Sequence, residues 1–119
     1  MTTNQQCNII QTGKLFSDSH PNKNRDWVIG DFIANPVLQT DKFEFKWQSG
    51  EKGQYRQPKP VLRHDVTTMA ILAYGHVRMR FTDGVDHHIK QQGDYVLWSP
   101  DEPHEFEFLQ DTLVITLRW

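Results

Sequence analysis

The chain lacks the features that mark several large classes of protein. Its 119 residues include a single cysteine, Cys7, which cannot form an internal disulfide and so argues against a disulfide-stapled secreted domain. Thirteen basic residues stand against 15 acidic ones, and no basic run favours nucleic acid or an anionic membrane as a partner. No apolar run is long enough to span a bilayer, and Met1–Gln6 has no signal-peptide character. We therefore expect one cytoplasmic domain, with no nucleic-acid or membrane partner.

The sequence also lacks a convincing amphipathic helix, and its periodicity is that of short β-strands. Residues 43–47 alternate aromatic and charged side chains, the period-2 sign of a half-buried strand. The pair Asp83-Gly84 is a strong hairpin signal. Further strand-like stretches cover residues 61–66, 67–74, 76–81, 85–90, 95–98, 104–109 and 112–119. Several short strands separated by turn signals predict an all-β sandwich or barrel.

Two regions flank or interrupt this pattern. Residues 1–35 form a polar N-terminal arm followed by an apolar stretch at 27–33, which is a strand or a strand-like lid segment, and residues 36–119 form the β-barrel domain. The loop at residues 50–60 carries two glycines and two prolines. A loop of this length in a small domain often bounds a site, so we expect Tyr55, Arg56 and Gln57 to close the mouth of the barrel.

The most informative stretch runs from Gly93 to His104. Gly93 can adopt positive φ and begins a turn, after which the residues up to Trp98 have strand character. Pro100 and Pro103 cannot donate ladder hydrogen bonds, so the chain leaves the sheet there. His104 therefore lies at a rigid junction between a loop and a strand, where it can hold a metal ion or a ligand.

With these residues the chain resembles a small single-domain cupin, a jelly-roll β-barrel. Gly93 and His104 have the spacing of the glycine and histidine in the family's second motif, and Asp94 follows the glycine as is usual there. The motif's proline is shifted by one position, to Pro100.

The first cupin motif is matched less completely. With Gly75 as its closing glycine, His64 falls at the second histidine of the motif's His-x-His pair. Leu62 stands at the first histidine, and the glutamate position falls near Thr67 or Thr68. The resemblance implies a cupin-type jelly-roll barrel with an N-terminal arm, and a homodimer formed through the arm or an outer sheet face.

In the family three histidines and a glutamate hold the metal, and His64 and His104 match two of these four positions. One hypothesis is that this pair binds a divalent metal ion (Fe, Mn, Ni or Zn), since neutral imidazole is a good ligand for such ions. The other is that both are interior histidines hydrogen-bonded to backbone, water or each other. His87, which shares a strand face with Ile89, is the candidate third ligand; its alternative is a solvent-facing position.

Further residues are assigned to the cavity and its surroundings. Glu102 or Glu105 is close enough in sequence to orient His104. Arg78 and Arg80, together with Arg63, form either a solvated face with acidic partners across the ladder, which we favour, or an anion-binding patch. The residues predicted to line the pocket are Trp47, Leu62, Thr68, Tyr74, Met79, Trp98 and Phe106.

The sequence leaves three functions open. The first is a small-molecule-binding cupin domain with an apolar pocket and a reduced histidine site. The second is a metal-dependent cupin enzyme of the dioxygenase or isomerase type acting on a small organic substrate, in which the metal leaves coordination positions open. The third is an interaction domain without a ligand. A fold alone does not decide among them.

Overall fold

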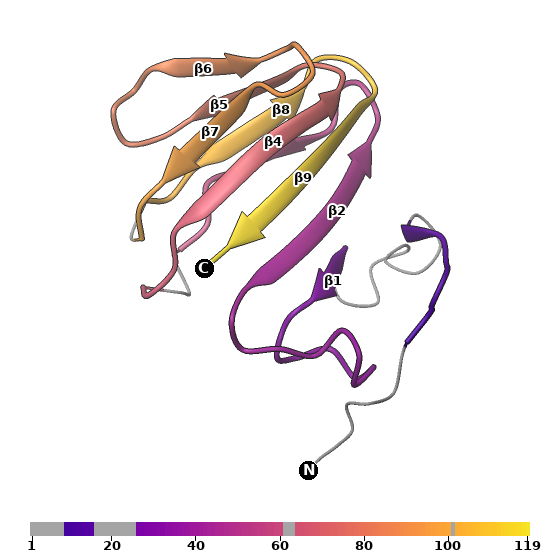
Figure 1. The fold of residues 1–119 in the computed structure, drawn as a ribbon. Coiled ribbons are helices and arrows are strands. Elements are labelled where there is room, and N and C mark those ends of the chain that lie inside the picture. Colours follow the sequence, from indigo (N-terminus) through magenta and orange to yellow (C-terminus); the bar gives the residue numbers. More distant parts are fainter. Residues whose placement is uncertain (1–8, 16–25, 61–63, 101) are drawn as a thin grey trace.

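The computed structural model describes residues 9–15, 26–60, 64–100 and 102–119, and they form nine β-strands in two antiparallel sheets (Figure 1). The first sheet has the order β1-β2-β9-β4-β7. Its strands are β1 (Trp27–Ile29), β2 (Glu44–Gly50), β9 (Thr112–Arg118), β4 (Thr68–Tyr74) and β7 (Tyr95–Trp98). The second sheet has the order β3-β8-β5-β6. Its strands are β3 (Tyr55–Arg56), β8 (Glu105–Phe108), β5 (Val77–Arg80) and β6 (Asp86–Ile89).

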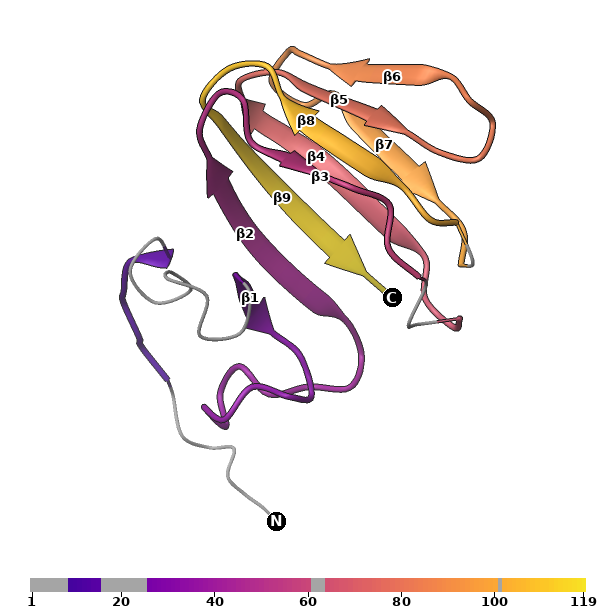
Figure 2. The same cartoon turned by 180° about the vertical axis from the view of Figure 1, so that it is seen from behind.

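The all-β jelly-roll class predicted from the sequence is confirmed, but closure into a barrel is not found. No strand pairing joins the two sheets within the described residues, so they lie face to face as a sandwich. β1 lies at the far edge of the first sheet, away from the second sheet (Figure 2). Residues 27–29 pair with β2, which makes them a strand of the sheet, one of the two alternatives for this stretch.

The turn signals define the connections between strands. The Asp83-Gly84 turn joins β5 to β6, which pair from Val77↔Ile89 to Arg80↔Asp86, and Gly84 has φ 73°. Gly93 has φ 89° before β7, as expected for the turn residue of this stretch. In the stretch predicted as a strand at 61–66, residues 64 and 65 form a bend instead. Residues 61–63 lie outside the described residues.

The strand register makes one face of the first sheet polar and the other apolar. On the polar face Lys46 pairs with Thr116, and Thr68 pairs with Arg118. These side chains point toward the second sheet. On the opposite face, two rows of apolar side chains cross β2, β9, β4 and β7: Phe45–Leu117–Met69–Leu97 and Trp47–Ile115–Ile71–Tyr95. The face covered by the second sheet is thus the more polar one.

The core lies between the sheets. Its members are buried apolar side chains from both layers: Ala70, Leu72, Val77, Met79, Ile89, Phe106, Phe108 and Val114. Trp98, Phe81 and Val96 pack against this cluster. The cluster also supplies the floor of the candidate site, because most of its members line the cavity described below. No helix in the described part of the chain is long and apolar enough to cross a membrane.

Candidate functional site

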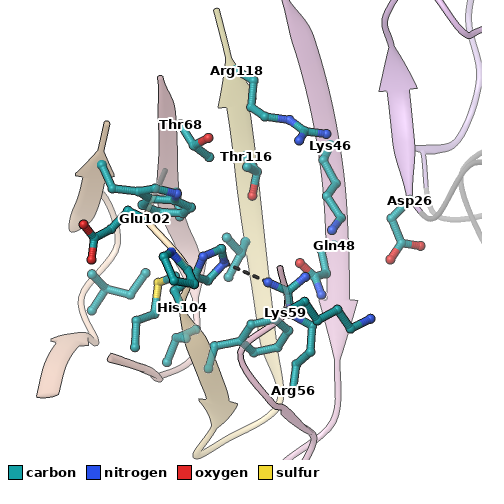
Figure 3. Close-up of a pocket in the computed structure, with 18 of the residues that line it drawn as sticks. Asp26, Lys46, Gln48, Arg56, Lys59, Thr68, Glu102, His104, Thr116 and Arg118 are labelled. Carbon is teal, nitrogen blue, oxygen red and sulfur yellow. Dashed lines mark hydrogen bonds between the residues drawn. The ribbon is translucent and has the colours of Figure 1, made fainter. Parts of the chain in front are cut away.

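A cavity of about 590 Å³ lies between the two sheets (Figure 3). Its volume is in the range of small-molecule sites. The apolar part of its lining comes from most of the core cluster together with Trp27, Val66, Trp98 and the prolines Pro60, Pro100 and Pro103. The polar part is formed by Asp26, Lys46, Gln48, Gln54, Tyr55, Arg56, Lys59, Thr68, Ser99, Glu102, His104, Thr116 and Arg118.

His104 is the central polar residue of this cavity. It follows Pro103 immediately before β8, as the sequence predicts, and its ring packs against Trp98 and Phe81, with centroids 4.8 and 5.6 Å away. Arg56 Nη2 lies 2.9 Å from His104 Nε2. Because a guanidinium only donates hydrogen bonds, Nε2 must be the acceptor, and the ring proton resides on Nδ1. The backbone of Glu102 accepts the hydrogen bond that the ring donates.

The surroundings keep His104 neutral. The pKa of His104 is lowered from 6.5 to about 4, first by burial, then by the charge of Arg56 and, to a smaller extent, by that of Lys46. The hydrogen bond to the Glu102 backbone acts in the opposite sense but does not offset the other causes. At neutral pH the imidazole is therefore an uncharged hydrogen-bond acceptor beside two cations.

Arg56 reaches His104 from the short strand β3, which pairs with β8 so that Arg56 lies opposite Phe106. The guanidinium carbon lies 5.2 Å from the centroid of the Phe106 ring, within the range of a cation–π contact. The composition of loop 50–60 predicts that Arg56 closes the mouth of the site. It gives no sign of the bond to His104, which joins residues 48 positions apart.

The cavity's other cationic and amide residues were also missed by the sequence pattern. Aromatic and charged residues alternate in the first part of β2, and Lys46 and Gln48, not the aromatic residues, face the cavity. Trp47, one of the predicted pocket residues, lies in the opposite apolar row, so its assignment to the pocket is corrected. Alternation defines two faces of a strand but does not say which one is covered.

The remaining pocket predictions divide as follows. Four of them line the cavity beside His104: Thr68, Met79, Trp98 and Phe106. Tyr74 does not, because it is the last residue of β4 and its side chain is 55% exposed. Leu62 lies outside the described residues.

The three histidines of the metal hypothesis are not brought together. His64 is exposed in the bend before β4 and does not line the cavity. His87 does not line it either; its Nε2 lies 2.9 Å from Asp83 Oδ2. In the described segments no group of three or more His, Cys, Asp or Glu side chains is placed to hold a metal ion. At His104 the Nε2 atom is engaged by the Arg56 guanidinium, 2.9 Å away.

The acidic residues near His104 have other partners. The Glu102 carboxylate accepts hydrogen bonds from the backbone and hydroxyl of Thr82, and the Glu102 backbone accepts one from His104. The Glu105 carboxylate accepts a hydrogen bond from Tyr55 and lies 3.6 Å from Arg78.

On the outer face of the second sheet, Arg78 and Arg80 pair with acids across the ladder. Arg78 lies 3.2 Å from Asp86 and 3.3 Å from Glu107, and Arg80 lies 2.8 Å from Asp86. The predicted acidic partners across the ladder are found, and the side chains of Arg78 and Arg80 are 17% and 46% exposed. Arg63 lies outside the described residues. Farther along, His76 Nε2 lies 2.8 Å from His88 Nδ1, outside the cavity.

The described part of the lining carries charges of both signs. Its cationic residues are Lys46, Arg56, Lys59 and Arg118, and its carboxylates are those of Asp26 and Glu102. The buried Glu44 pairs with Arg118 at 2.9 Å, and the Arg118 guanidinium carbon lies 3.9 Å from the centroid of the Trp27 ring.

These features define an all-β jelly-roll domain with a polar-mouthed cavity between its sheets. No family model matches the sequence, and no curated protein matches it. Among solved structures, KdgF from a Halomonas species is similar at 18% identity and a TM-score of 0.58, over 66% of this chain and 69% of that one. A Cupin 2 conserved barrel domain protein from Salinispora arenicola is similar at 18% identity and a TM-score of 0.59, over 74% and 71%.

A sugar phosphate isomerase of the cupin superfamily from Silicibacter pomeroyi is also similar, at 14% identity and a TM-score of 0.53, over 64% of this chain and 49% of that one. Likenesses at this level of identity establish the fold. The chain therefore has the cupin fold predicted from its second motif, and its function has to be argued from its own cavity.

Proposed function

We propose that the chain is a small-molecule-binding cupin-fold domain that holds its ligand in the cavity through His104 and Arg56 without a metal ion. The observation that carries this proposal is the 2.9 Å hydrogen bond from Arg56 to His104 Nε2 inside a cavity of about 590 Å³. An apolar lining with a few convergent polar groups is typical of ligand sites.

The alternative, a metal-dependent enzyme of the dioxygenase or isomerase type, is less well supported. A metal ion on His104 would have to displace the guanidinium of Arg56 and would then lie beside that cation and Lys46. His64 and His87 lie outside the cavity lining and supply no further ligands there. A neutral histidine paired with an arginine is instead suited to binding oxygen-containing groups, since one side accepts and the other donates hydrogen bonds.

The test is a cavity-filling variant with a matched control. Thr116→Phe places a ring in the cavity from β9, whereas Leu117→Phe places the same ring on the opposite face of that strand. In a fragment screen by NMR, we expect fragments that shift the His104 signals to bind the wild type and Leu117→Phe, and to bind Thr116→Phe at least about tenfold more weakly.

Two further results would contradict the proposal. Fragments that bind Thr116→Phe as tightly as the wild type would place the ligand elsewhere. Near-stoichiometric metal in tag-free protein, absent from His104→Ala, together with fragment binding abolished by EDTA, would favour the metal site. We expect binding to be unaffected by EDTA.

We further propose that the chain forms a homodimer through the apolar outer face of the first sheet. The two rows that cross this face contain no Lys, Arg, Asp or Glu, and Tyr95 and Leu97 in them are 59% and 49% exposed. A continuous apolar face of this kind marks an interaction surface. A second copy fits it because like-for-like contact of uncharged rows brings no repelling charges together.

Leu97→Glu should weaken this dimer by about 100-fold, since a carboxylate would be buried among apolar side chains. Light scattering over a dilution series should then give the mass of one chain for the variant and of two for the wild type. The matched control is Val85→Glu, at a residue that is 51% exposed between β5 and β6. A wild type that is monomeric at all concentrations would refute the homodimer. The cytoplasmic location and the division at residue 35 stay predictions.

A further inference from the structure

Two histidines meet on the second sheet, away from the cavity. His76 Nε2 lies 2.8 Å from His88 Nδ1, and neither residue lines the cavity. Their rings are tilted by 59° with centroids 5.0 Å apart, so a nitrogen of one ring faces a nitrogen of the other. His76 is half-buried and His88 is exposed. Two imidazole nitrogens therefore converge at a place that solvent can reach.

The backbone holds both histidines in position. The N–H of His76 donates to the Thr112 hydroxyl at 3.1 Å, and the carbonyl of His76 accepts from the N–H of Leu109 at 2.8 Å. Gly75, just before His76, has φ 104°, and a Cβ atom there would overlap Thr112. His88 lies within β6, which pairs with β5 beside it (Figure 1). A site carried by two paired strands loses little conformational freedom when it binds a ligand.

The separation of the two nitrogens is close to the one that a shared metal ion requires. Nitrogen ligands lie about 2.0–2.1 Å from zinc, so two of them at a tetrahedral angle are about 3.3 Å apart. The 2.8 Å pair would have to open by only about 0.5 Å, at the ends of two side chains. Each neutral imidazole would then carry its proton on its other ring nitrogen, so the pair binds the ion without releasing a proton.

The ligand type selects the class of ion. Imidazole suits Zn, Cu and Ni, and the affinity of a given site for divalent ions is highest for Cu²⁺. The neighbouring acids Asp86 and Glu107 are paired with Arg78, and no third His, Cys, Asp or Glu joins the two histidines within the described residues. The other coordination positions are thus left to water or to a ligand from outside the chain.

We propose that His76 and His88 form a surface site for a divalent transition-metal ion, which binds Cu²⁺ more tightly than Zn²⁺. The site is separate from the cavity and does not depend on the binding function proposed there. Lys90 follows Ile89 just after β6, and its positive charge acts on His76. This charge also repels a bound cation, so it weakens the site.

The experiment titrates tag-free protein with Zn²⁺ at about pH 7.5, where an ordinary imidazole is mostly neutral, and follows the histidine ring signals by NMR. We expect the signals of His76 and His88 to shift together. The affinity should fall at least about tenfold in His76→Gln and in His88→Gln, because one ligand is then left. Lys90→Gln should bind Zn²⁺ more tightly than the wild type. The matched control is His87→Gln, next to His88 on β6, because His87 is bonded to Asp83 and should not affect the affinity.

The same titration shows how the proposal would fail. No shift of either ring up to about 1 mM Zn²⁺ would overturn it, and so would shifts that persist in both glutamine variants, because another group would then hold the ion. The rest of each spectrum shows whether a variant is folded. In calorimetry Cu²⁺ should bind at least about tenfold more tightly than Zn²⁺, and equal affinities would overturn the ranking of the two ions. Zn²⁺ binding should be unchanged in His104→Ala, which separates this site from the cavity and its fragment screen.

Discussion

Replacing Phe108 by alanine should lower the free energy of unfolding by about 3–5 kcal/mol, the usual cost of deleting a buried phenylalanine ring. Phe108 is 1% exposed, and its ring stacks on Phe106 with centroids 5.2 Å apart. A Cβ atom at Gly50 would overlap the Phe108 ring, so glycine is required there for β2 to approach it. The ring also lines the floor of the cavity, so the deletion would enlarge a space that is already present.

Urea denaturation followed by fluorescence measures this loss as a shift of the midpoint. The matched control is Phe43→Ala, because Phe43 is 41% exposed just before β2 and its deletion should cost less than about 1 kcal/mol. Equal losses for the two variants would show that Phe108 does not belong to the core.

The fold could be predicted from the sequence because its strands and turns are encoded locally. Asp83-Gly84 and Gly93 stand where the chain turns, and both glycines have positive φ in the structure. The short alternating stretches mark β4 to β9 closely enough to identify an all-β class. The spacing from Gly93 to His104 also places His104 correctly, because the prolines between them determine where the chain leaves the sheet.

The candidate site could be predicted only in part because its contacts are long-range. Alternation in β2 separates Trp47 from Lys46 without saying which side the second sheet covers, and the polar side is the covered one. The His104 partner, Arg56, comes from a strand of only two residues at the edge of the other sheet. His64 was assigned by its spacing to Gly75 within a motif, but a bend replaces the strand that would carry it into the cavity.

In the first sheet the same alternation of side chains forms an apolar outer face and a polar inner face. Its outer rows are apolar, which suits contact with another copy, and its inner rows carry the lysine, glutamine and threonine that line the cavity. The core cluster between the sheets, with Phe108 among its members, forms the apolar floor of the same cavity. The cavity is thus the part of the sandwich interior where polar side chains of the first sheet lie above core residues.

Acidification from pH 7 to about pH 4.5 should remove about 2–3 kcal/mol of stability through His104 alone. Its folded-state pKa of about 4 lies below the value of 6.5 for an exposed histidine, so the unfolded chain binds more protons in this interval. The contribution is therefore fully present above about pH 6.5 and is lost as the pH falls toward 4. Protonation would also place a third positive charge beside Arg56 and Lys46 and abolish the acceptor at Nε2.

The measurement is the free energy of unfolding of the wild type and His104→Gln at several pH values in this interval. A glutamine amide can accept a hydrogen bond from Arg56 without titrating, so the variant should lose most of the pH dependence that His104 supplies. The control is His76→Gln, because burial, His88 and Lys90 lower the pKa of His76 on the outer face, and its smaller contribution has the same sign. The carboxylates with lowered pKa values, such as Asp86 and Asp94, act mainly below this interval. If His104→Gln keeps the full wild-type slope, His104 is not a buried neutral acceptor, and the hydrogen bond that centres the proposed binding site is absent in solution.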